Sequence, residues 1–295
     1  MKILIFGAGG MVGHKIFEVL TSKGLPVYGT FKRSQTDYNQ IDFFKKAISE
    51  NKILENIDLN HDASLFGVLD SLKPDIILNC VGITLRKEEI KNLDYCLRIN
   101  SFLPHKIRCW AEQNKAYLVH FSTDCVFSGK EGQYIESSYP SANDNYGRTK
   151  YLGEVMGESA LTLRGSMIGR ELYGKTELLE WAFAQNGKTI NGFSKAIYSG
   201  VTTDFMAQLV HRIITDRERL TGIYQVSSAP MSKFELLKKL NDAFKLNMTV
   251  LDDSSYESSK ILISDKLKTK LKIQVPSWDA MIAELAKEKS NVFSG

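Results

Sequence analysis

The chain has 295 residues, of which 43% are hydrophobic and 24% are charged, and its formal net charge is +4 at pH 7. This length exceeds one ordinary domain, and the composition is that of a packed globular protein, not of a disordered or collagen-like chain. Because no run of five Lys and Arg residues gathers the mild positive charge, we expect no nucleic-acid polymer as a partner.

Membrane insertion and metal binding are not expected either. No stretch of about 18 apolar residues occurs that would span a bilayer, and a glycine cluster follows the apolar residues 1–6 too early for a secretory signal peptide. The cysteines and histidines show no zinc-ligand spacing. We therefore predict a cytoplasmic protein with reduced thiols and no metal site.

Short apolar runs alternate with segments of helical period through the first half of the chain. The runs cover residues 2–6, 26–30, 76–81 and 117–122, and helical segments such as 12–22 and 100–114 lie between them. Runs that are apolar on both faces are typical of buried parallel strands covered by helices. Residues 1–165 therefore predict an α/β dinucleotide-binding domain with a Rossmann-type doubly wound parallel sheet.

The regular alternation fades after residue 165. Helices are predicted over residues 176–185, 204–217, 232–244 and 278–287, and short strands over 196–199, 222–227 and 249–251. Residues 166–295 are therefore expected to form a smaller mixed α/β substrate-binding lobe, with segments that return to pack on the first domain. A ligand cleft is expected between the two parts.

A glycine-rich motif follows the first predicted strand and opens the first predicted helix. It contains Gly7, Gly9, Gly10 and Gly13, with Met11 and Val12 between them. Glycines at this position let the backbone turn sharply and approach a pyrophosphate, whose charge is stabilised by the helix N-terminus. The motif predicts nucleotide binding, and the alternative is a tight strand-to-helix turn without a ligand.

Basic residues stand after the second predicted strand, where an acid would hold the adenosine ribose of NAD. Lys32 and Arg33 offer positive charge there, and a guanidinium suits a ribose 2′-phosphate. This favours NADPH over NADH, with two solvated loop residues as the alternative. Asp58 and the adjoining Leu59 follow the expected third strand, where the carboxylate can accept a hydrogen bond from adenine or simply lie in a loop.

The fourth predicted strand ends in four residues expected beside the cofactor, namely Asn79, Cys80, Val81 and Gly82. Small side chains at this point let a cofactor lie against the end of the strand, and close packing is the alternative. Thr84 and Arg86 follow near the expected cleft. Arg86 is a candidate for the diphosphate of a substrate, although a solvated loop charge is the stronger interpretation.

Tyr146 and Lys150 are four residues apart, so they project from one face if the segment is helical. A free tyrosine has a pKa of about 10, and a nearby ammonium favours the phenolate, which improves the phenol as a general acid and base. The pair alone occurs by chance in many helices. Its position after an N-terminal glycine motif and after Ser122, Thr123 and Asp124 makes a chance match unconvincing.

Taken together, these motifs resemble the extended short-chain dehydrogenase/reductases, and within them the dTDP-4-dehydrorhamnose reductases. The resemblance rests on residues 7–13, 122–127, 146–150, 163–164, 200–204 and 222–227. It implies that Tyr146 protonates the nascent alkoxide, that Lys150 lowers the pKa of Tyr146 and holds the nicotinamide ribose, and that Thr123 hydrogen-bonds the substrate oxygen. It also places Asn100 at the start of a helix that supports the site, where a helix cap is an equal alternative.

Two positions depart from the pattern of the dTDP-4-dehydrorhamnose reductases. Cys125 follows Asp124 where that group carries tyrosine, and residues 165–167, which end in Met167, replace Thr-Ser-Trp. Both positions would line the sugar end of the cleft. A related 6-deoxy or amino-sugar nucleotide is therefore as compatible with the sequence as dTDP-4-dehydrorhamnose.

The resemblance implies an NADPH-dependent reduction of the keto group of a nucleotide-linked sugar, in surface polysaccharide biosynthesis. A sugar-nucleotide epimerase or dehydratase of the same superfamily is the enzymatic alternative, although Cys125 does not continue an acidic pair after Asp124. A non-catalytic NADP-binding regulatory subunit is the alternative from another class. Intact Tyr146 and Lys150 argue against it, and the oligomeric state stays open, with a homodimer as one expectation.

Overall fold

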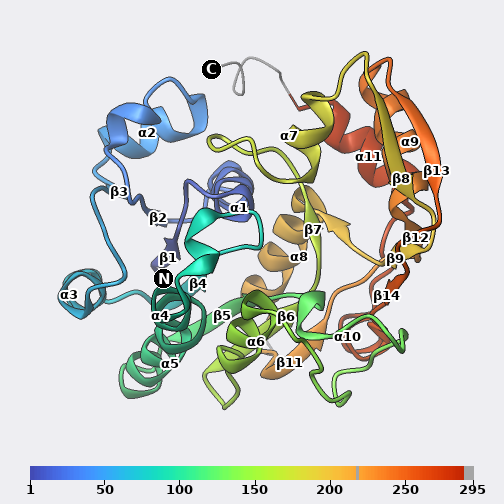
Figure 1. Ribbon diagram of the computed structural model, residues 1–295. Coiled ribbons are helices and arrows are strands. Elements are labelled where there is room, and N and C mark those ends of the chain that lie inside the picture. The colour runs from blue at the N-terminus through green and yellow to red at the C-terminus, as the bar shows by residue number, and fades with distance from the viewer. Residues whose placement is uncertain (217–218, 289–295) are drawn as a thin grey trace.

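A parallel sheet of seven strands forms the centre of the protein, in the order β11-β6-β5-β4-β1-β2-β3 (Figure 1). The structure is a computed structural model that describes residues 1–216 and 219–288. The end of the helix predicted over 204–217 and the last residues of the predicted second lobe therefore lie outside the described residues. The sheet confirms the predicted α/β fold class. Its strands are β1 (Ile3–Phe6), β2 (Val27–Thr30), β3 (Ile53–Leu54), β4 (Ile76–Asn79), β5 (Tyr117–Ser122), β6 (Ala160–Arg164) and β11 (Gly222–Gln225).

The strands are apolar on both faces because each face packs against helices. In β1, Ile3 and Ile5 belong to one hydrophobic cluster, whereas Leu4 and Phe6 belong to the other. All four side chains are fully buried. The alternation of side chains along a strand thus divides the core into two layers, one on each side of the sheet.

Each face of the sheet has its own helices. The layer that contains Ile3 and Ile5 is completed by helices α1 (Met11–Ser22), α2 (Asp42–Ser49) and α8 (Thr203–Thr215). The opposite layer is completed by α3 (Asp62–Leu72) and α5 (Leu103–Gln113). Helix α6 (Asn145–Leu152) and the 3-10 turns η1 (Gln35–Asp37), η2 (Glu88–Lys91) and η4 (Asp124–Val126) lie in the connections. Among residues 1–216 and 219–288, no helix is long and apolar enough to cross a membrane.

The helix predicted over residues 100–114 begins earlier than expected. Helix α4 (Leu93–Cys96), the π-helical turn η3 (Leu97–Phe102) and α5 run on from one another with right-handed helical backbone at the junctions. The N-cap is Asn92, whose side chain accepts a hydrogen bond from the Tyr95 amide at 3.1 Å. Asn100 therefore lies inside a helix and not at its start, which corrects the predicted position and removes the helix-cap interpretation.

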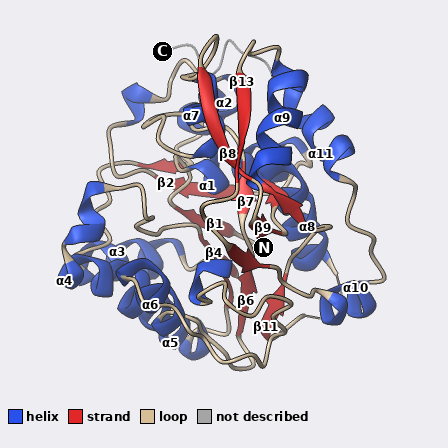
Figure 2. Ribbon diagram, turned by 45° about the vertical axis from the view of Figure 1, so that its right-hand side comes forward, coloured by secondary structure: helices blue, strands red, loops and turns tan. Residues whose placement is uncertain are grey.

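The second part of the chain folds around three small sheets beside the main one (Figure 2). The pair of parallel strands that stands out in Figure 2 is β8 (Thr189–Phe193) with β13 (Thr249–Asp253). The strand β9 (Ala196–Tyr198) lies between β12 (Met231–Ser232) and β14 (Ser258–Lys260), and β7 (Met167–Ile168) pairs with β10 (Val201–Thr202). The helices of this part are α7 (Leu178–Phe183), α9 (Lys233–Phe244), α10 (Asp265–Leu271) and α11 (Trp278–Ala286).

Two elements from the second half of the chain belong to the main body. The strand predicted over residues 222–227 is β11, which pairs in parallel with β6 and forms one edge of the central sheet. Helix α8 packs beside α1 in the same hydrophobic layer. The chain therefore passes between its two parts more than once. These crossings hold the two parts against one another on either side of the cleft.

Candidate active site

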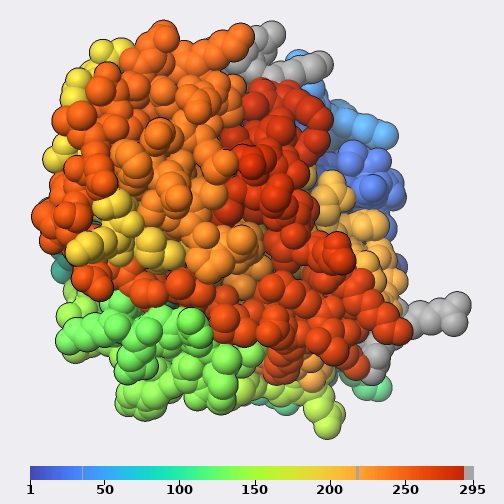
Figure 3. Space-filling model, turned by 90° about the vertical axis from the view of Figure 1, so that its right-hand side faces the viewer, coloured from blue at the N-terminus to red at the C-terminus, as the bar shows by residue number. Residues whose placement is uncertain are grey.

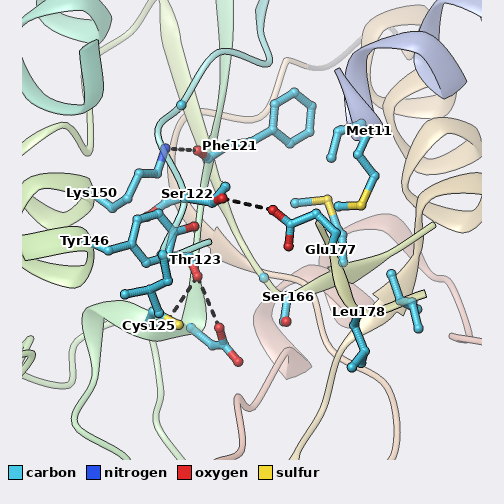
Figure 4. A pocket seen from close by; sticks show the side chains of 18 of the residues that line it. Met11, Phe121, Ser122, Thr123, Cys125, Tyr146, Lys150, Ser166, Glu177 and Leu178 are labelled. Carbon is cyan, nitrogen blue, oxygen red and sulfur yellow. Dashed lines mark hydrogen bonds between the residues drawn. The ribbon is translucent and has the colours of Figure 1, made fainter. Parts of the chain in front are cut away.

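A cavity of about 330 Å³ lies between the ends of the central strands and the second part of the chain. This volume is within the range of about 300 to 1,000 Å³ that small-molecule sites usually have. Figure 4 shows residues from both parts facing one another across it. One wall carries Thr123, Cys125, Tyr146 and Lys150, and the facing wall carries Met11, Ser166, Glu177 and Leu178.

Helix α6 places Tyr146 and Lys150 in this cavity. The side chain of Asp144 caps the helix by accepting a hydrogen bond from the Gly147 amide at 2.8 Å. The two residues are one turn apart on the helix, as their spacing predicts. The Lys150 Nζ donates a hydrogen bond to the Phe121 carbonyl oxygen at 2.6 Å, which ties the helix to the end of β5.

Thr123 and Tyr146 both line this cavity, and the Thr123 hydroxyl is near enough to the phenol to influence its pKa. The Thr123 Oγ1 also donates to Asp124 Oδ1 at 3.1 Å and accepts from the Cys125 amide at 3.1 Å. The last of these caps the turn η4 that follows β5. The Thr123 hydroxyl is thus held near the phenol at the end of a buried strand.

Burial determines the ionisation of the two catalytic candidates. It raises the pKa of Tyr146 above its ordinary value, while the Thr123 hydroxyl acts in the opposite direction. It lowers the pKa of Lys150 to about 8. The direction at Tyr146 is opposite to the lowering expected from the Lys150 ammonium, because desolvation of the phenolate outweighs the other effects. Tyr146 is therefore a neutral phenol at pH 7, which is the form that donates a proton.

A buried ion pair supports the strand that leads to Thr123. Arg164 Nη2 lies 2.6 Å from Glu154 Oε2, and both side chains are almost fully buried. Glu154 Oε1 accepts a second hydrogen bond from the Ser122 hydroxyl at 2.6 Å. Glu154 thus links Ser122, the last residue of β5, to Arg164, the last residue of β6. Sequence reasoning did not identify Glu154.

A second cavity, of about 270 Å³, lies next to the first. Its lining includes the predicted cofactor residues Gly7, Gly10, Lys32, Asp58 and Leu59. The two cavities share Cys80, Val81 and Gly82, which follow β4. Together they offer an elongated site from the glycine motif to Tyr146, as a dinucleotide requires.

The glycine motif brings the start of α1 close to the strand ends. Gly7 has a positive φ of 78°, a conformation that favours glycine. A Cβ atom on Gly13 would lie 2.1 Å from the Gly7 carbonyl oxygen, so a larger residue would push the helix away. These two glycines form the tight turn that opens the second cavity.

Five predicted cofactor residues lie outside the linings of both cavities, namely Gly9, Gly13, Arg33, Asn79 and Asn100. Gly9 makes room for Tyr38, since a Cβ atom there would lie 2.5 Å from the Tyr38 hydroxyl. The Arg33 guanidinium lies over the Tyr173 ring, 5.7 Å from its centroid. Tyr38 and Tyr173 contact one another, with 5.0 Å between their ring centroids, so Gly9 and Arg33 border the same pair of aromatic rings.

Asn100 fixes the loop that separates the two cavities. Its amide nitrogen donates to the Ile83 carbonyl at 3.0 Å and to Thr149 Oγ1 at 3.1 Å, and its oxygen accepts from the Ile83 amide at 2.8 Å. Asn79 similarly accepts from the Val81 amide at 3.3 Å and contacts His120 at 3.2 Å. Both asparagines position the backbone around Gly82 and do not line the cavities themselves.

Lys32 is one of two lysines, with Lys87, that line the second cavity. Its Nζ donates to the Tyr95 hydroxyl at 3.1 Å. This hydrogen bond raises the pKa of Lys32, and the nearby carboxylates Asp58 and Glu89 raise it further. Lys32 is therefore a cation at neutral pH on the wall of the cavity.

The predicted substrate residues Thr84, Arg86, Asp124, Cys125 and Met167 all line the first cavity. Thr84 donates to Glu177 Oε1 at 2.9 Å. Arg86 donates to the Thr176 carbonyl at 3.0 Å and lies 3.9 Å from Glu177. Arg86 thus contacts the loop before α7 while its side chain stays exposed, so its contact with a substrate diphosphate stays a prediction beside the alternative of a solvated loop charge.

Further residues of the first cavity were not predicted. Glu177, Tyr198 and Lys233 line it from three different elements of the second part. No motif marks Glu177 or Tyr198 in the sequence. One feature of the sequence could have pointed to Lys233. It directly follows the helix cap Ser232 and so lies in the first turn of a helix, where acidic residues are preferred.

Solved structures and sequence relatives share this architecture. The structure is similar to the crystal structure of dTDP-4-dehydrorhamnose reductase from Bacillus anthracis in complex with NADP, with a TM-score of 0.81, 22% identity, and coverage of 98% of this chain and 99% of that one. The dTDP-4-dehydrorhamnose reductase of Aggregatibacter actinomycetemcomitans is 23% identical over 78% of this chain and 74% of its own length. A Haloferax volcanii protein named Probable low-salt glycan biosynthesis reductase Agl14 is 24% identical over 57% of this chain, and the match spans about half, 54%, of that relative.

The doubly wound sheet, with the glycine motif at one end of the site and Tyr146 and Lys150 at the other, defines an extended short-chain dehydrogenase/reductase, as the sequence predicted. More narrowly, the chain belongs to the family described as RmlD substrate binding domain, whose model matches residues 1–290. This membership confirms the predicted oxidoreductase class.

Proposed function

We propose that the protein is an NADPH-dependent reductase that converts the keto group of a nucleotide-linked sugar to an alcohol. The observation that carries the proposal is that Thr123, Tyr146 and Lys150 line one cavity, which shares Cys80, Val81 and Gly82 with the cavity at the glycine motif. Two hydroxyl donors at one point suit an oxygen on which negative charge develops. A bound reduced nicotinamide would supply the hydride for the carbonyl carbon.

The residues of the chain have separate tasks in this reaction. Tyr146 donates its proton to the carbonyl oxygen, and burial keeps the phenol protonated until then. Thr123 donates a hydrogen bond to the same oxygen. Lys150, held at the end of β5 by the Phe121 carbonyl, faces the shared wall of the two cavities and contributes to cofactor binding.

The wall residues fit a dinucleotide with a 2′-phosphate. The tight turn at Gly7 and Gly13 leaves the start of α1 open to a pyrophosphate, and Lys32 supplies the cation for the phosphate on the adenosine ribose. The residues that would hold the cofactor are Gly7, Gly10, Met11, Val12, Lys32, Asp58, Leu59, Cys80, Val81, Gly82, Tyr146 and Lys150.

The substrate is proposed to be a 6-deoxy or amino-sugar nucleotide used in surface polysaccharide biosynthesis. The names of the relatives support a dTDP-linked keto sugar and a glycan pathway. Cys125 and Met167 line the cavity at the positions that depart from the dTDP-4-dehydrorhamnose reductases. The sugar can therefore differ from dehydrorhamnose at the atoms that these side chains contact.

Oxidation of NADPH in the presence of a panel of 4-keto sugar nucleotides tests the proposal. We expect turnover with at least one member of the panel and loss of turnover in Tyr146→Phe. A protein that binds NADP but oxidises NADPH with none of them would be a binding subunit instead. Conversion of a nucleotide sugar without net NADPH oxidation would identify an epimerase or dehydratase.

A further inference from the structure

Lys233 and Tyr198 lie in the first cavity but have no task in the proposed reduction. Lys233 is the first residue of α9, and Tyr198 is the last residue of β9. The Lys233 Nζ lies over the tyrosine ring, 3.6 Å from its centroid. A cation over an aromatic face is stabilised by the ring, which holds the ammonium in this place.

The position of Lys233 is unfavourable for a cation in two ways. The amino end of a helix carries partial positive charge, so a lysine in the first turn is repelled. Burial also disfavours the ammonium and lowers the pKa of Lys233 to about 8. Among the described residues, no carboxylate oxygen lies within 4.0 Å of the Lys233 Nζ. A cation that is placed against both the helix dipole and the cost of burial is typical of a functional site.

Tyr198 adds a second donor at the same place. Its side chain is only 4% exposed. The hydroxyl is buried and finds no hydrogen-bond partner within the described part of the chain. The Trp278 ring, 5.5 Å away between centroids, packs against the tyrosine. A buried hydroxyl without a partner is costly unless a ligand completes its hydrogen bond.

The charges around Lys233 leave this end of the cavity positive. The Asp124 carboxylate favours its ammonium, whereas Arg86 and Lys260 repel it. Arg86 is 3.9 Å from Glu177, while Lys260 contacts the Cys125 sulfur at 3.3 Å. A ligand that carries negative oxygens would satisfy the ammonium and the phenol together.

We infer that Lys233 and Tyr198 bind an oxyanion of the substrate, which is either a phosphate of the nucleotide or a carboxylate on the sugar. The inference rests on the proposed function, since it assigns the negatively charged group of the same nucleotide sugar. Lys233 and Tyr198 thus select anionic substrates, and Thr123 and Tyr146 act on the carbonyl.

Calorimetric titration of the NADP-loaded protein tests this assignment without turnover. The probes are dTDP, UDP and GDP for the phosphate source, and UDP-glucuronate against UDP-glucose for the carboxylate source. The variants are Lys233→Met, Lys233→Arg and Tyr198→Phe. Lys238→Met, an exposed lysine on the same helix, is the matched control. Unchanged NADP affinity verifies that each variant is folded.

If a phosphate is bound, Lys233→Met weakens the nucleoside diphosphates about tenfold or more, because a charged hydrogen bond is lost. If a carboxylate is bound, the wild type prefers UDP-glucuronate, and Lys233→Met loses that preference while UDP affinity stays the same. In either case Tyr198→Phe weakens binding of the probe that Lys233→Met weakens, and Lys233→Arg retains most of the wild-type affinity for that probe.

The inference is overturned if Lys233→Met binds every probe as the wild type does, or if the wild type binds none of them. The proposed function fails in a different way, when the protein binds these probes but reduces no keto sugar nucleotide.

Discussion

The Cys125 sulfur lies 3.3 Å from the Lys260 Nζ, so the loop after β5 and the strand β14 meet beside the first cavity. The same two segments continue side by side, since the Tyr134 amide donates to the Ile261 carbonyl at 2.8 Å. Figure 3 shows the green segment after β5 lying against the orange and red C-terminal elements. Cys125 is therefore both a cavity residue and part of the junction between the two parts of the chain.

We expect Cys125→Tyr to change the ranking of sugar substrates. The larger ring enters the cavity and displaces Lys260, whereas Cys80, Val81 and Gly82 at the cofactor wall remain in place. The catalytic efficiency with each member of a sugar-nucleotide panel measures the ranking, and NADPH affinity serves as the control. Cys125→Ala, which removes the sulfur without adding bulk, separates the two effects. A fixed ranking with weakened NADPH binding would contradict the placement of Cys125.

Replacement of Tyr146 by phenylalanine is expected to lower the turnover number by about 10² to 10⁴, the usual contribution of a general acid. The change removes one hydroxyl and little volume, so NADPH affinity and the melting temperature stay close to those of the wild type. Tyr151→Phe, an exposed position on the same helix, is the control. Single-turnover measurements decide the matter, and a Tyr146→Phe enzyme as fast as the wild type would place the acid elsewhere.

Lys32 and Arg33 are expected to contribute unequally to the preference for NADPH. Lys32 lines the cofactor cavity, whereas Arg33 lies over Tyr173. Lys32→Ala should reduce the NADPH-to-NADH ratio of kcat/KM roughly tenfold, because one charged contact to the phosphate is lost. Arg33→Ala should change it less. Equal ratios in the wild type and both variants would argue against discrimination at this position.

The Glu154–Arg164 pair is expected to matter for stability. Removing one partner of a buried pair leaves an uncompensated charge and typically costs about 3 to 5 kcal/mol. Arg164→Met should therefore lower the free energy of unfolding by about this amount in a urea titration. The double variant Glu154→Leu with Arg164→Met should recover part of the loss. A single variant as stable as the wild type would show that water reaches Glu154.

The buried Lys150 predicts a rise of stability in mildly alkaline solution. Its pKa is about 8 in the folded protein, below the ordinary value of 10.5. Between these values the unfolded chain binds more protons than the folded one, so the free energy of unfolding increases with pH. Urea titrations from pH 7 to pH 10 should show this rise, and Lys150→Met should reduce it. An identical pH profile in the variant would mean that Lys150 is not desolvated.

The elements that carry the chemistry were predictable because their signals are local. The apolar run 117–122 coincides with β5, and Tyr146 and Lys150 lie one turn apart on helix α6, as their spacing required if the segment is helical. The glycine motif likewise follows β1 and opens α1 as expected. In each case a few neighbouring residues contain both the periodicity and the residue that acts.

Residues that act through distant contacts were not predictable. Tyr198 and Lys233 meet only because β9 and α9 fold over the ends of the central strands. Gly9 belongs to the glycine motif, but the side chain that it makes room for, Tyr38, comes from the connection after β2. The raised pKa of Tyr146 depends on burial, which the spacing to Lys150 does not reveal.

The pairing of β11 with β6 also has a consequence for synthesis on the ribosome. One edge of β6 has no partner strand until β11, which ends at Gln225, has emerged from the ribosome. All the other strands of the central sheet precede β11 in the chain. An open, apolar strand edge invites association with other chains, and pairings between distant residues slow folding. During synthesis the protein thus passes through a stage in which the other six strands of the sheet have emerged while the edge of β6 is still unpaired. Chaperones would be needed most at this stage.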